Sequence, residues 1–367
     1  MSSALLKTRR SQLTKGRLPG YAIWVVLGTA VVLAAAVSAL IGFDVLVWAL
    51  IAAVFFVAGA TLVTAAAEGR RKAADSLMTY LVYGAFVIAL LPLLSVIWTV
   101  LERGLPGLSY DFFFTSMNGV TGATDNASAE NGTPVLGGAY HAIVGTLQIT
   151  LWATLVSVPI GLLAAVYLVE YGRGGALDRA ITFFVDVMTG IPSIVAGLFA
   201  AALFALLFGP GTRTGFVASV ALSVLMIPVV VRSTEEMLKI VPNELREASY
   251  ALGVRKWRTI VKVVVPTAIS GIASGVTLAI ARVVGETAPI LVTAGFASSI
   301  NLNVFGGWMS TLPTFIYYQI LTPTSPTNID ASTQRAWAAA LILIIMVMLL
   351  NVVARLVARI FAPRTSR

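Results

Sequence analysis

Apolar residues in this chain form eight long runs that are separated by shorter polar segments. Each run is long enough to cross a hydrocarbon core of ~30 Å, which takes about 20 helical residues. A segment in lipid must satisfy its own backbone hydrogen bonds, so each run predicts a membrane-spanning helix. The sequence therefore predicts an all-α, polytopic membrane protein with about eight transmembrane helices, at roughly residues 21–42, 45–67, 77–101, 140–169, 180–208, 215–238, 267–297 and 336–360.

The composition agrees with this class of protein. Hydrophobic residues make up 58% of the 367 residues and charged residues only 11%, whereas soluble domains average about 25% charged residues. The chain has no cysteine and a single histidine, His141. These counts exclude disulfides, zinc–thiolate sites, iron–sulfur clusters and thiol nucleophiles, and they leave no histidine-based metal site or catalytic triad. We expect no metal ligands and no enzyme activity, and a packing or interfacial role for His141.

Lysine and arginine are unevenly distributed between the predicted loops. If the N-terminus is cytoplasmic, 21 of the 25 basic residues fall on the cytoplasmic side, and only Arg103, Arg213 and Arg335 fall outside. The remaining one, Arg282, lies within a predicted span. By the positive-inside rule, this asymmetry places both termini in the cytoplasm. It also accounts for the net charge of +9 without a nucleic-acid partner.

Two longer segments, residues 102–138 and 301–334, face outward in this topology. The first is rich in Gly, Asn, Ser and Thr, and the second contains FGGWMSTLPTFIYYQIL. That stretch is too apolar for a solvated linker, so we expect it to lie on the membrane surface or to pack on the helix bundle.

The longest charged stretch of the chain lies at residues 232–266, on the cytoplasmic side. Pro242 followed by Asn243 is typical of a helix start, with Asn243 as a candidate N-cap. Gly253 predicts the end of this helix, and a second helix is expected from about Arg255. Apolar residues recur at helical spacing on the first helix: Leu245, Ala248, Ala251 and Leu252. The pattern fits an amphipathic connector on an anionic membrane or a docking element for a partner protein.

This stretch resembles the EAA loop of ATP-binding cassette (ABC) transporter permeases. The family pattern is EAA, three residues, Gly, nine residues, then I-x-L-P. Here EAS, three residues, Gly253, nine residues and VVVP keep the spacing. The resemblance implies that one set of residues couples the permease to an ATPase subunit: Glu247, Ala248, Ser249, Gly253 and Pro266. None of the six lysines lies in a P-loop motif, so the ATPase must be a separate chain.

Residues 267–300 carry only two charges, Arg282 and Glu286. An unpaired charge in the bilayer costs at least ~2.5–3.5 kcal/mol, so such residues usually face a bundle interior or a pathway. Their i,i+4 spacing predicts an ion pair on one helical face. The pair either merely neutralises Arg282, or holds Arg282 in an anion route, where its planar fork suits a tetrahedral oxyanion. Two interruptions of the same helix, a feature found near substrate sites in transporters, support a pathway: Gly285 and Pro289.

The segment RVVGETAPILVTAGF is similar to one in the PstA-type permease of the phosphate-specific ABC transporter. Further matches across residues 137–345 are GTLQIT, YLVEYG, GIPSIVAGL, IPVVVRSTEEML and REASYALG. The resemblance implies a six-helix importer core in the bacterial cytoplasmic membrane, forming one of two non-identical halves that carry inorganic phosphate inward. It implies four kinds of partner: a PstC-type permease, two PstB-type subunits that hold ATP and Mg, an extracytoplasmic PstS-type phosphate-binding protein, and membrane lipid. No cofactor is implied for this chain.

Compared with the six spans of the family, the chain has an additional N-terminal hairpin, expected to face lipid or to serve assembly. We therefore divide it into four parts: 1–76, basic tail and hairpin; 77–139, first core helix and outer loop; 140–300, permease core with the EAA loop at 239–266; and 301–367, outer segment, last span and basic tail.

Two alternative functions remain at this point. One is an ABC permease for sulfate or molybdate, and the other is an ion-coupled secondary carrier or channel that needs no ATPase. Asp186, about two turns from Arg179, is expected to snorkel or to cap a helix rather than to line a pathway.

Overall fold

The computed structural model describes residues 18–172 and 174–361, and this part of the chain contains helices and no strand. The chain divides into two compact units, residues 1–98 and 99–367, and each is described by itself. The all-α prediction is confirmed. Within the described residues, seven helices are long and apolar enough to cross a membrane, or eight when one bent pair is counted as a single span.

The first unit contains α1 (Ala22–Ile41), α2 (Val45–Glu68) and most of α3 (Arg70–Gly104). α1 and α2 form a hairpin in which Asp44 caps α2, because its carboxylate accepts hydrogen bonds from the backbone amides of Leu46 and Val47. Trp48 donates from Nε1 to the carbonyl of Val31 at 3.3 Å, which joins the two helices. The predicted additional hairpin is therefore present. Helix α3 continues without a break through residue 76, where we placed the boundary between the hairpin and the first core helix.

The core of the second unit is a parallel pair of helices, α6 (Tyr140–Val166) and α9 (Gly215–Ile240). The hydroxyl of Ser219 donates to the carbonyl of Ile149 at 3.1 Å, and that of Ser223 to the carbonyl of Ala153 at 3.4 Å. Both partners advance by four residues in the same direction, so the helices run parallel. Small residues let the backbones approach closely enough for these bonds, as in other membrane bundles.

The predicted span at 180–208 is broken into α7 (Ala176–Gly190) and α8 (Ser193–Phe208), which are bent by 110°. The break follows from Pro192, because proline has no N–H to donate to the preceding turn. Since α6 and α9 run parallel, the chain must return between them, and we count α7 and α8 as one bent crossing. With this bent pair, the described residues offer up to eight candidate crossings.

Helix α12 (Val265–Val284) packs against both α9 and α15 (Asp330–Phe361). Against α9 it runs antiparallel, with Gly271 next to Met237 and Gly275 next to Ser233. The buried apolar residues of this core come mainly from α6, α9, α12 and α13 (Ala288–Thr293), with Leu222, Leu225, Met226, Val230, Val283 and Ile290 among them.

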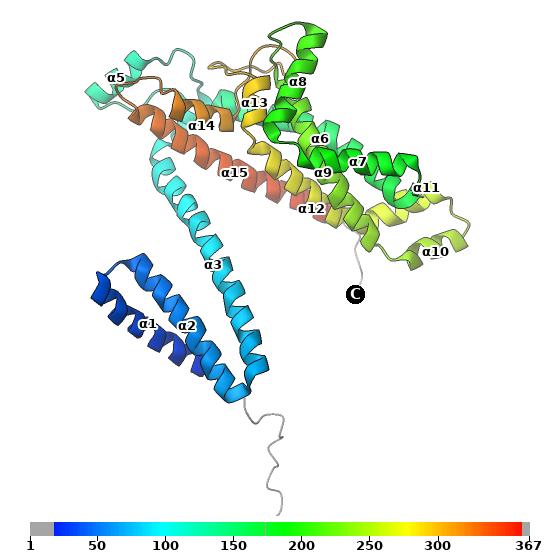
Figure 1. The fold of residues 1–367 in the computed structure, drawn as a ribbon. Coiled ribbons are helices and arrows are strands. Elements are labelled where there is room, and N and C mark those ends of the chain that lie inside the picture. The colour runs from blue at the N-terminus through cyan, green and yellow to red at the C-terminus, as the bar shows by residue number, and fades with distance from the viewer. Residues whose placement is uncertain (1–17, 173, 362–367) are drawn as a thin grey trace, which may run out of the picture. The chain divides into compact units, whose positions relative to one another are not determined.

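Short helices lie at the two ends of the second unit (Figure 1). One end carries α4 (Tyr110–Phe114), α5 (Gly122–Asn131), α13 and α14 (Leu312–Leu321). The other end carries α10 (Asn243–Ala251) and α11 (Lys256–Thr259). The apolar stretch at 305–321 packs on the bundle, as predicted, because Met309, Leu312 and Phe315 are buried.

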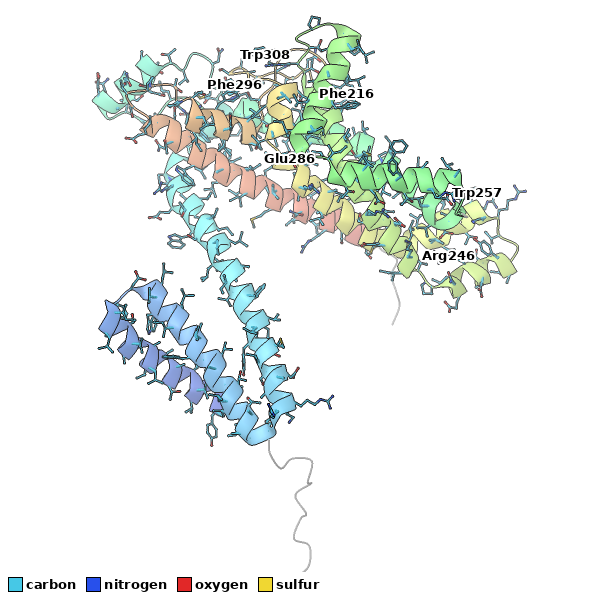
Figure 2. All side chains as sticks on the ribbon, in the orientation of Figure 1. Phe216, Arg246, Trp257, Glu286, Phe296 and Trp308 are labelled. Carbon is cyan, nitrogen blue, oxygen red and sulfur yellow. The ribbon has the colours of Figure 1, made fainter. Side chains whose placement is uncertain are left out.

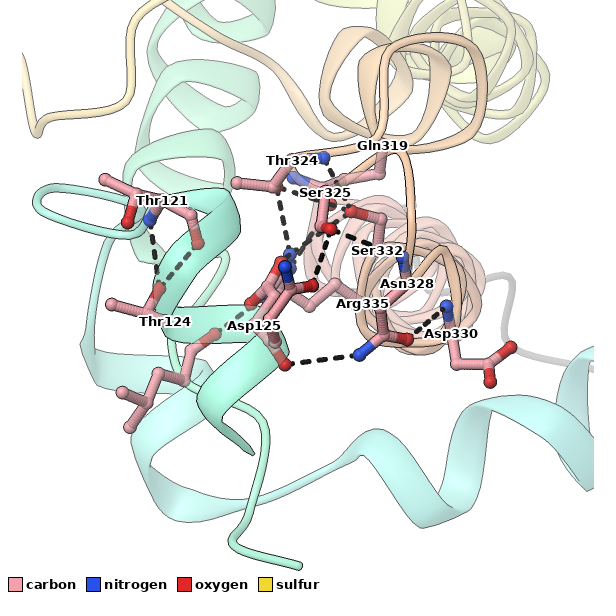
Figure 3. A network of polar contacts seen from close by, with 12 residues as sticks. Thr121, Thr124, Asp125, Gln319, Thr324, Ser325, Asn328, Asp330, Ser332 and Arg335 are labelled. Atoms are coloured by element: carbon pink, nitrogen blue, oxygen red, sulfur yellow. Dashed lines mark hydrogen bonds and ion pairs between the residues drawn. The ribbon is translucent and has the colours of Figure 1, made fainter. Parts of the chain in front are cut away.

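A buried ion pair holds the first of these ends together (Figure 3). Arg335, at the start of α15, donates to both carboxylate oxygens of Asp125 on α5, at 2.9 and 2.6 Å. Its exposure is 2% and that of Asp125 is 0%. The guanidinium also donates to four further oxygens, on Leu136, Gln319, Thr324 and Ser332. One arginine thus joins segments that lie about 200 residues apart in the sequence.

Candidate functional site: the coupling loop and the α12–α13 junction

The predicted helix–turn–helix at 239–266 is present as α10 and α11. Asn243 is not the N-cap: Pro242 occupies that position, and the Asn243 side chain instead accepts a hydrogen bond from Arg246 Nη1 at 3.2 Å. Gly253 has φ +74°, a left-handed conformation that favours glycine, and it ends the first helix as predicted. α11 continues through a π-helical turn, Ile260–Val264, into α12, whose first turn contains Pro266.

One face of this loop is apolar and exposed. Leu252 is 83% exposed, Trp257 52% and Leu245 41%, and Ala248 and Ala251 are exposed with them. The charged side chain of Glu247 is exposed beside these apolar residues. Ser249 differs, because it is buried and its hydroxyl lies 2.8 Å from that of Thr259. Ser249 therefore joins α10 to α11, while the other predicted coupling residues of α10 face outward.

The opposite face of the loop is held by a buried carboxylate that sequence reasoning missed. Glu170 lies in a π-helical turn, Tyr167–Tyr171, that extends α6. Arg246 donates to Glu170 Oε1 from Nε at 3.0 Å and from Nη2 at 2.8 Å. Their side chains are 13% and 5% exposed. The only signal in the sequence was that the matched segments YLVEYG and REASYALG contain these two residues.

The residues of the proposed anion route lie at the junction of α12 and α13, away from Arg246 and Trp257 (Figure 2). Arg282 is exposed in the last turn of α12, which ends at Val284, and Glu286 is half-buried beyond it. No ion pair joins Arg282 to Glu286 in the described part of the chain. The i,i+4 pairing fails because Gly285 ends the helix before a full turn separates the two residues. Arg282 is instead placed favourably at a helix C-terminus.

Pro289 brings the two matched motifs GIPSIVAGL and GETAP into contact. A Cβ added to Gly197 of α8 would lie 2.6 Å from Pro289 Cα. The carbonyl of Pro289 accepts from the hydroxyl of Thr293 at 2.6 Å, and the carbonyl of Thr293 accepts from the amide of Thr214 at 3.1 Å. The junction is thereby fixed to α8 and to the start of α9.

This contact predicts that Gly197→Val destabilises the protein. Overpacking of a tight contact typically costs 1–3 kcal/mol, and here the obstacle is backbone, which cannot move aside as a side chain can. We expect a lower Tm for the purified variant, measured by thermal unfolding. Gly28→Val on α1, where an added Cβ meets nothing within 4 Å, is the matched control. Equal Tm values for the two variants would show that the α8–α13 contact is loose.

Asp186 caps no helix in the described residues. Its carboxylate pairs with Arg232 of α9, and Arg232 also contacts Glu235 at 3.0 Å. Glu235 in turn pairs with Lys239 at 2.6 Å. Of the two expected roles, capping is wrong, because α7 passes α9 closely enough for the carboxylate to pair with a cation on the neighbouring helix. Snorkelling stays a prediction.

Comparison with known proteins finds membrane components of transport systems. The family described as binding-protein-dependent transport system inner membrane component matches residues 157–367. Phosphate transport system permease protein PstA 1 of Mycobacterium tuberculosis (strain ATCC 25618 / H37Rv) is 46% identical, covering 81% of this chain and 91% of that protein. PstA of Mycobacterium leprae is 45% identical (77% and 88% covered), and PstA of Pasteurella multocida is 38% identical (81% and 97% covered).

Among solved structures, a chain of the MetNI methionine ABC transporter in an inward facing conformation aligns with 21% identity and a TM-score of 0.48, over 60% of this chain and 94% of that one. The match to the transport-system family, over residues 157–367, contains the loop formed by α10 and α11 and the α12–α13 junction. Because of this match and the 46% identity to a PstA permease, the chain belongs to the binding-protein-dependent transport system inner membrane components and, within that family, to the PstA permeases.

Proposed function

We propose that this chain is a transmembrane permease subunit of an ATP-driven importer of inorganic phosphate in the bacterial cytoplasmic membrane. The observation that carries the proposal is a family-typical coupling loop with an exposed apolar face, in a chain that is 46% identical to a phosphate transport system permease. The chain forms half of the pathway and hydrolyses no ATP. Its N- and C-termini lie in the cytoplasm, as the distribution of basic residues favours.

The proposed complex contains four further subunits. A homologous PstC-type permease supplies the other half of the pathway, and two PstB-type subunits bind ATP and Mg. A PstS-type binding protein delivers phosphate to the extracytoplasmic face. The permease itself binds no cofactor and no metal, and lipid surrounds its apolar faces.

Arg282 is the residue proposed to contact the anion. Its guanidinium is exposed on this chain and forms no ion pair within the described residues, so its charge is available to a substrate or to the partner half. Because arginine stays charged and offers a planar fork of donors, it suits a phosphate oxygen pair. Glu286 lies one short turn beyond and would limit how tightly the anion is held. The break at Gly285 and Pro289 lets the chain change direction at this point.

Uptake of labelled phosphate tests the proposal. We expect uptake by cells that lack their own high-affinity system when the chain is co-expressed with the four partner subunits. Excess sulfate or molybdate should not compete. Transport of sulfate or molybdate without competition from phosphate would overturn the assignment of phosphate as the substrate. Uptake that persists without the ATP-binding subunits would favour an ion-coupled carrier.

Leu252→Asp should remove the ATP-binding subunits from the purified complex and lower uptake at least ~10-fold. Leu252 is 83% exposed, so the substitution leaves the fold of this chain intact while placing a charge in the proposed docking face, where desolvation of an unpaired charge is costly. Co-purification followed by quantitative blotting measures the loss. Leu302→Asp, at the opposite end and 70% exposed, is the matched control. Retention of the ATP-binding subunits by Leu252→Asp would place the docking face elsewhere.

A further inference from the structure

The side chain of Glu170 is a carboxylate buried at the end of α6, with 5% of its surface exposed. A buried charge is tolerated only when it is paired and hydrogen-bonded. Glu170 satisfies this condition with a residue 76 positions later in the sequence, Arg246 on α10. The chain therefore maintains a costly group at this position, and its partner lies in the coupling loop.

Arg246 links three separate parts of the second unit. Besides Glu170 at the end of α6, its guanidinium donates to the carbonyls of Leu238 at 3.0 Å and Val241 at 2.6 Å, which lie at the open C-terminus of α9. Arg246 itself lies on α10. Its donors thus fix the first helix of the loop to the ends of both core helices.

A second contact fixes the other helix of the loop to the same turn. The ammonium group of Lys256, the first residue of α11, donates to the backbone carbonyl of Glu170 and lies 4.8 Å from the ring centroid of Tyr171. Glu170 lies in the last turn of this helical segment, where backbone carbonyls have no intrahelical partner and can accept from a side chain. With Ser249 and Thr259 joining α10 to α11, the loop contacts α6 at two points and is braced internally.

We propose that Glu170 is a positioning residue that attaches the coupling loop rigidly to the α6–α9 pair. The loop is joined through the backbone to α9 and α12 only. Through Glu170 it also moves with α6, so tilting of the loop carries the whole pair. The inference rests on the proposed function in assigning ATPase docking to this loop, but the attachment itself can be measured independently of transport.

Distance measurements between spin labels test the attachment. The chain has no cysteine, so cysteines introduced at Leu163 on α6 and Glu244 on α10, both exposed, can be labelled selectively. In the purified complex we expect one narrow distance distribution for wild-type Glu170 and a distribution at least ~2-fold wider for Glu170→Gln. Glu130→Gln, an exposed glutamate on α5, is the matched control. An unchanged distribution in Glu170→Gln overturns the proposal.

The functional readout is phosphate imported per ATP hydrolysed in proteoliposomes. Glu170→Gln should lower this ratio ~10-fold while the ATP-binding subunits still co-purify, and Glu170→Asp, which keeps the charge, should restore part of it. A merely structural role would lower assembly, uptake and ATP hydrolysis together, without rescue by aspartate, and would overturn the positioning role. If wild type imports no phosphate but the distance result holds, the proposed function fails and the attachment stands. If neither Glu170→Gln nor Glu170→Asp folds, Lys256→Met, which removes the second contact of the loop with this turn, tests the attachment by the same two measurements.

Discussion

Replacing Arg282 by alanine is expected to abolish phosphate uptake while the complex still assembles. Arg282 is exposed on this chain and lies in the last turn of α12, so its removal leaves no buried partner unpaired. Removing one partner of a desolvated charge pair in a binding site costs about 2–5 kcal/mol, and every 1.4 kcal/mol is tenfold in affinity. We therefore expect uptake to fall ~30-fold or more. Arg282→Lys should lie between alanine and wild type, because lysine keeps the charge and loses the planar fork.

The measurement is labelled-phosphate uptake, with co-purification of all subunits as the test of assembly. Arg71→Ala provides the matched control, because Arg71 is exposed at the start of α3. Unchanged uptake by Arg282→Ala would remove this residue from the pathway. Loss of assembly together with uptake would instead assign Arg282 to stabilising the end of α12 or its contact with the partner half.

Replacing Arg335 by methionine should destabilise the end of the second unit that carries α5 and α14 by about 3–5 kcal/mol, the usual cost of breaking a buried ion pair. The variant leaves the Asp125 carboxylate fully buried with its cation gone, and Arg335 also donates to four other oxygens. Thermal unfolding of the purified protein measures the effect, and limited proteolysis of residues 102–138 locates it.

A double substitution separates two quantities: the destabilisation caused by an unpaired buried carboxylate, and the net contribution of the ion pair to stability. Asp125→Leu combined with Arg335→Met removes both charges, and apolar replacements of buried ion pairs are often neutral. We expect the double variant to be more stable than Arg335→Met alone. If both variants unfold at the wild-type temperature, the ion pair contributes nothing to the stability of this end.

Hydropathy was sufficient to predict which segments form long apolar helices, because the requirement for internally satisfied backbone in lipid acts on each segment separately. The span predicted at 267–297 is wrong in its end, because α12 stops at Val284 before Gly285. Hydropathy could not predict the 110° bend between α7 and α8, although Pro192 offered a signal, because a proline in a membrane helix can produce either a mild kink or a break. The position of Gly253 could be predicted from motif spacing, since a left-handed turn has a strong preference for glycine.

The ion pairs show where prediction from sequence ends. Spacing indicated a pair between Arg282 and Glu286, but this inference assumed a helix that continues past Gly285. The pairs that do form join distant segments, Glu170 with Arg246 and Arg335 with Asp125. A single sequence contains no information on which of its distant charges meet, and Arg335 was therefore assigned only to an outer loop.

The serine bonds between α6 and α9 limit how these helices can slide. Ser219 and Ser223 each bond a carbonyl of α6 as well as one of their own helix, so a displacement of less than one turn, about 5.4 Å, would break both interhelical bonds at once. The contact between α12 and α9 contains no side-chain hydrogen bond in the described residues and is made by glycines against Ser233 and Met237. Shear motion in the second unit should therefore concentrate along the α9–α12 contact, where no hydrogen bond fixes the register, while the serine-linked pair keeps its own.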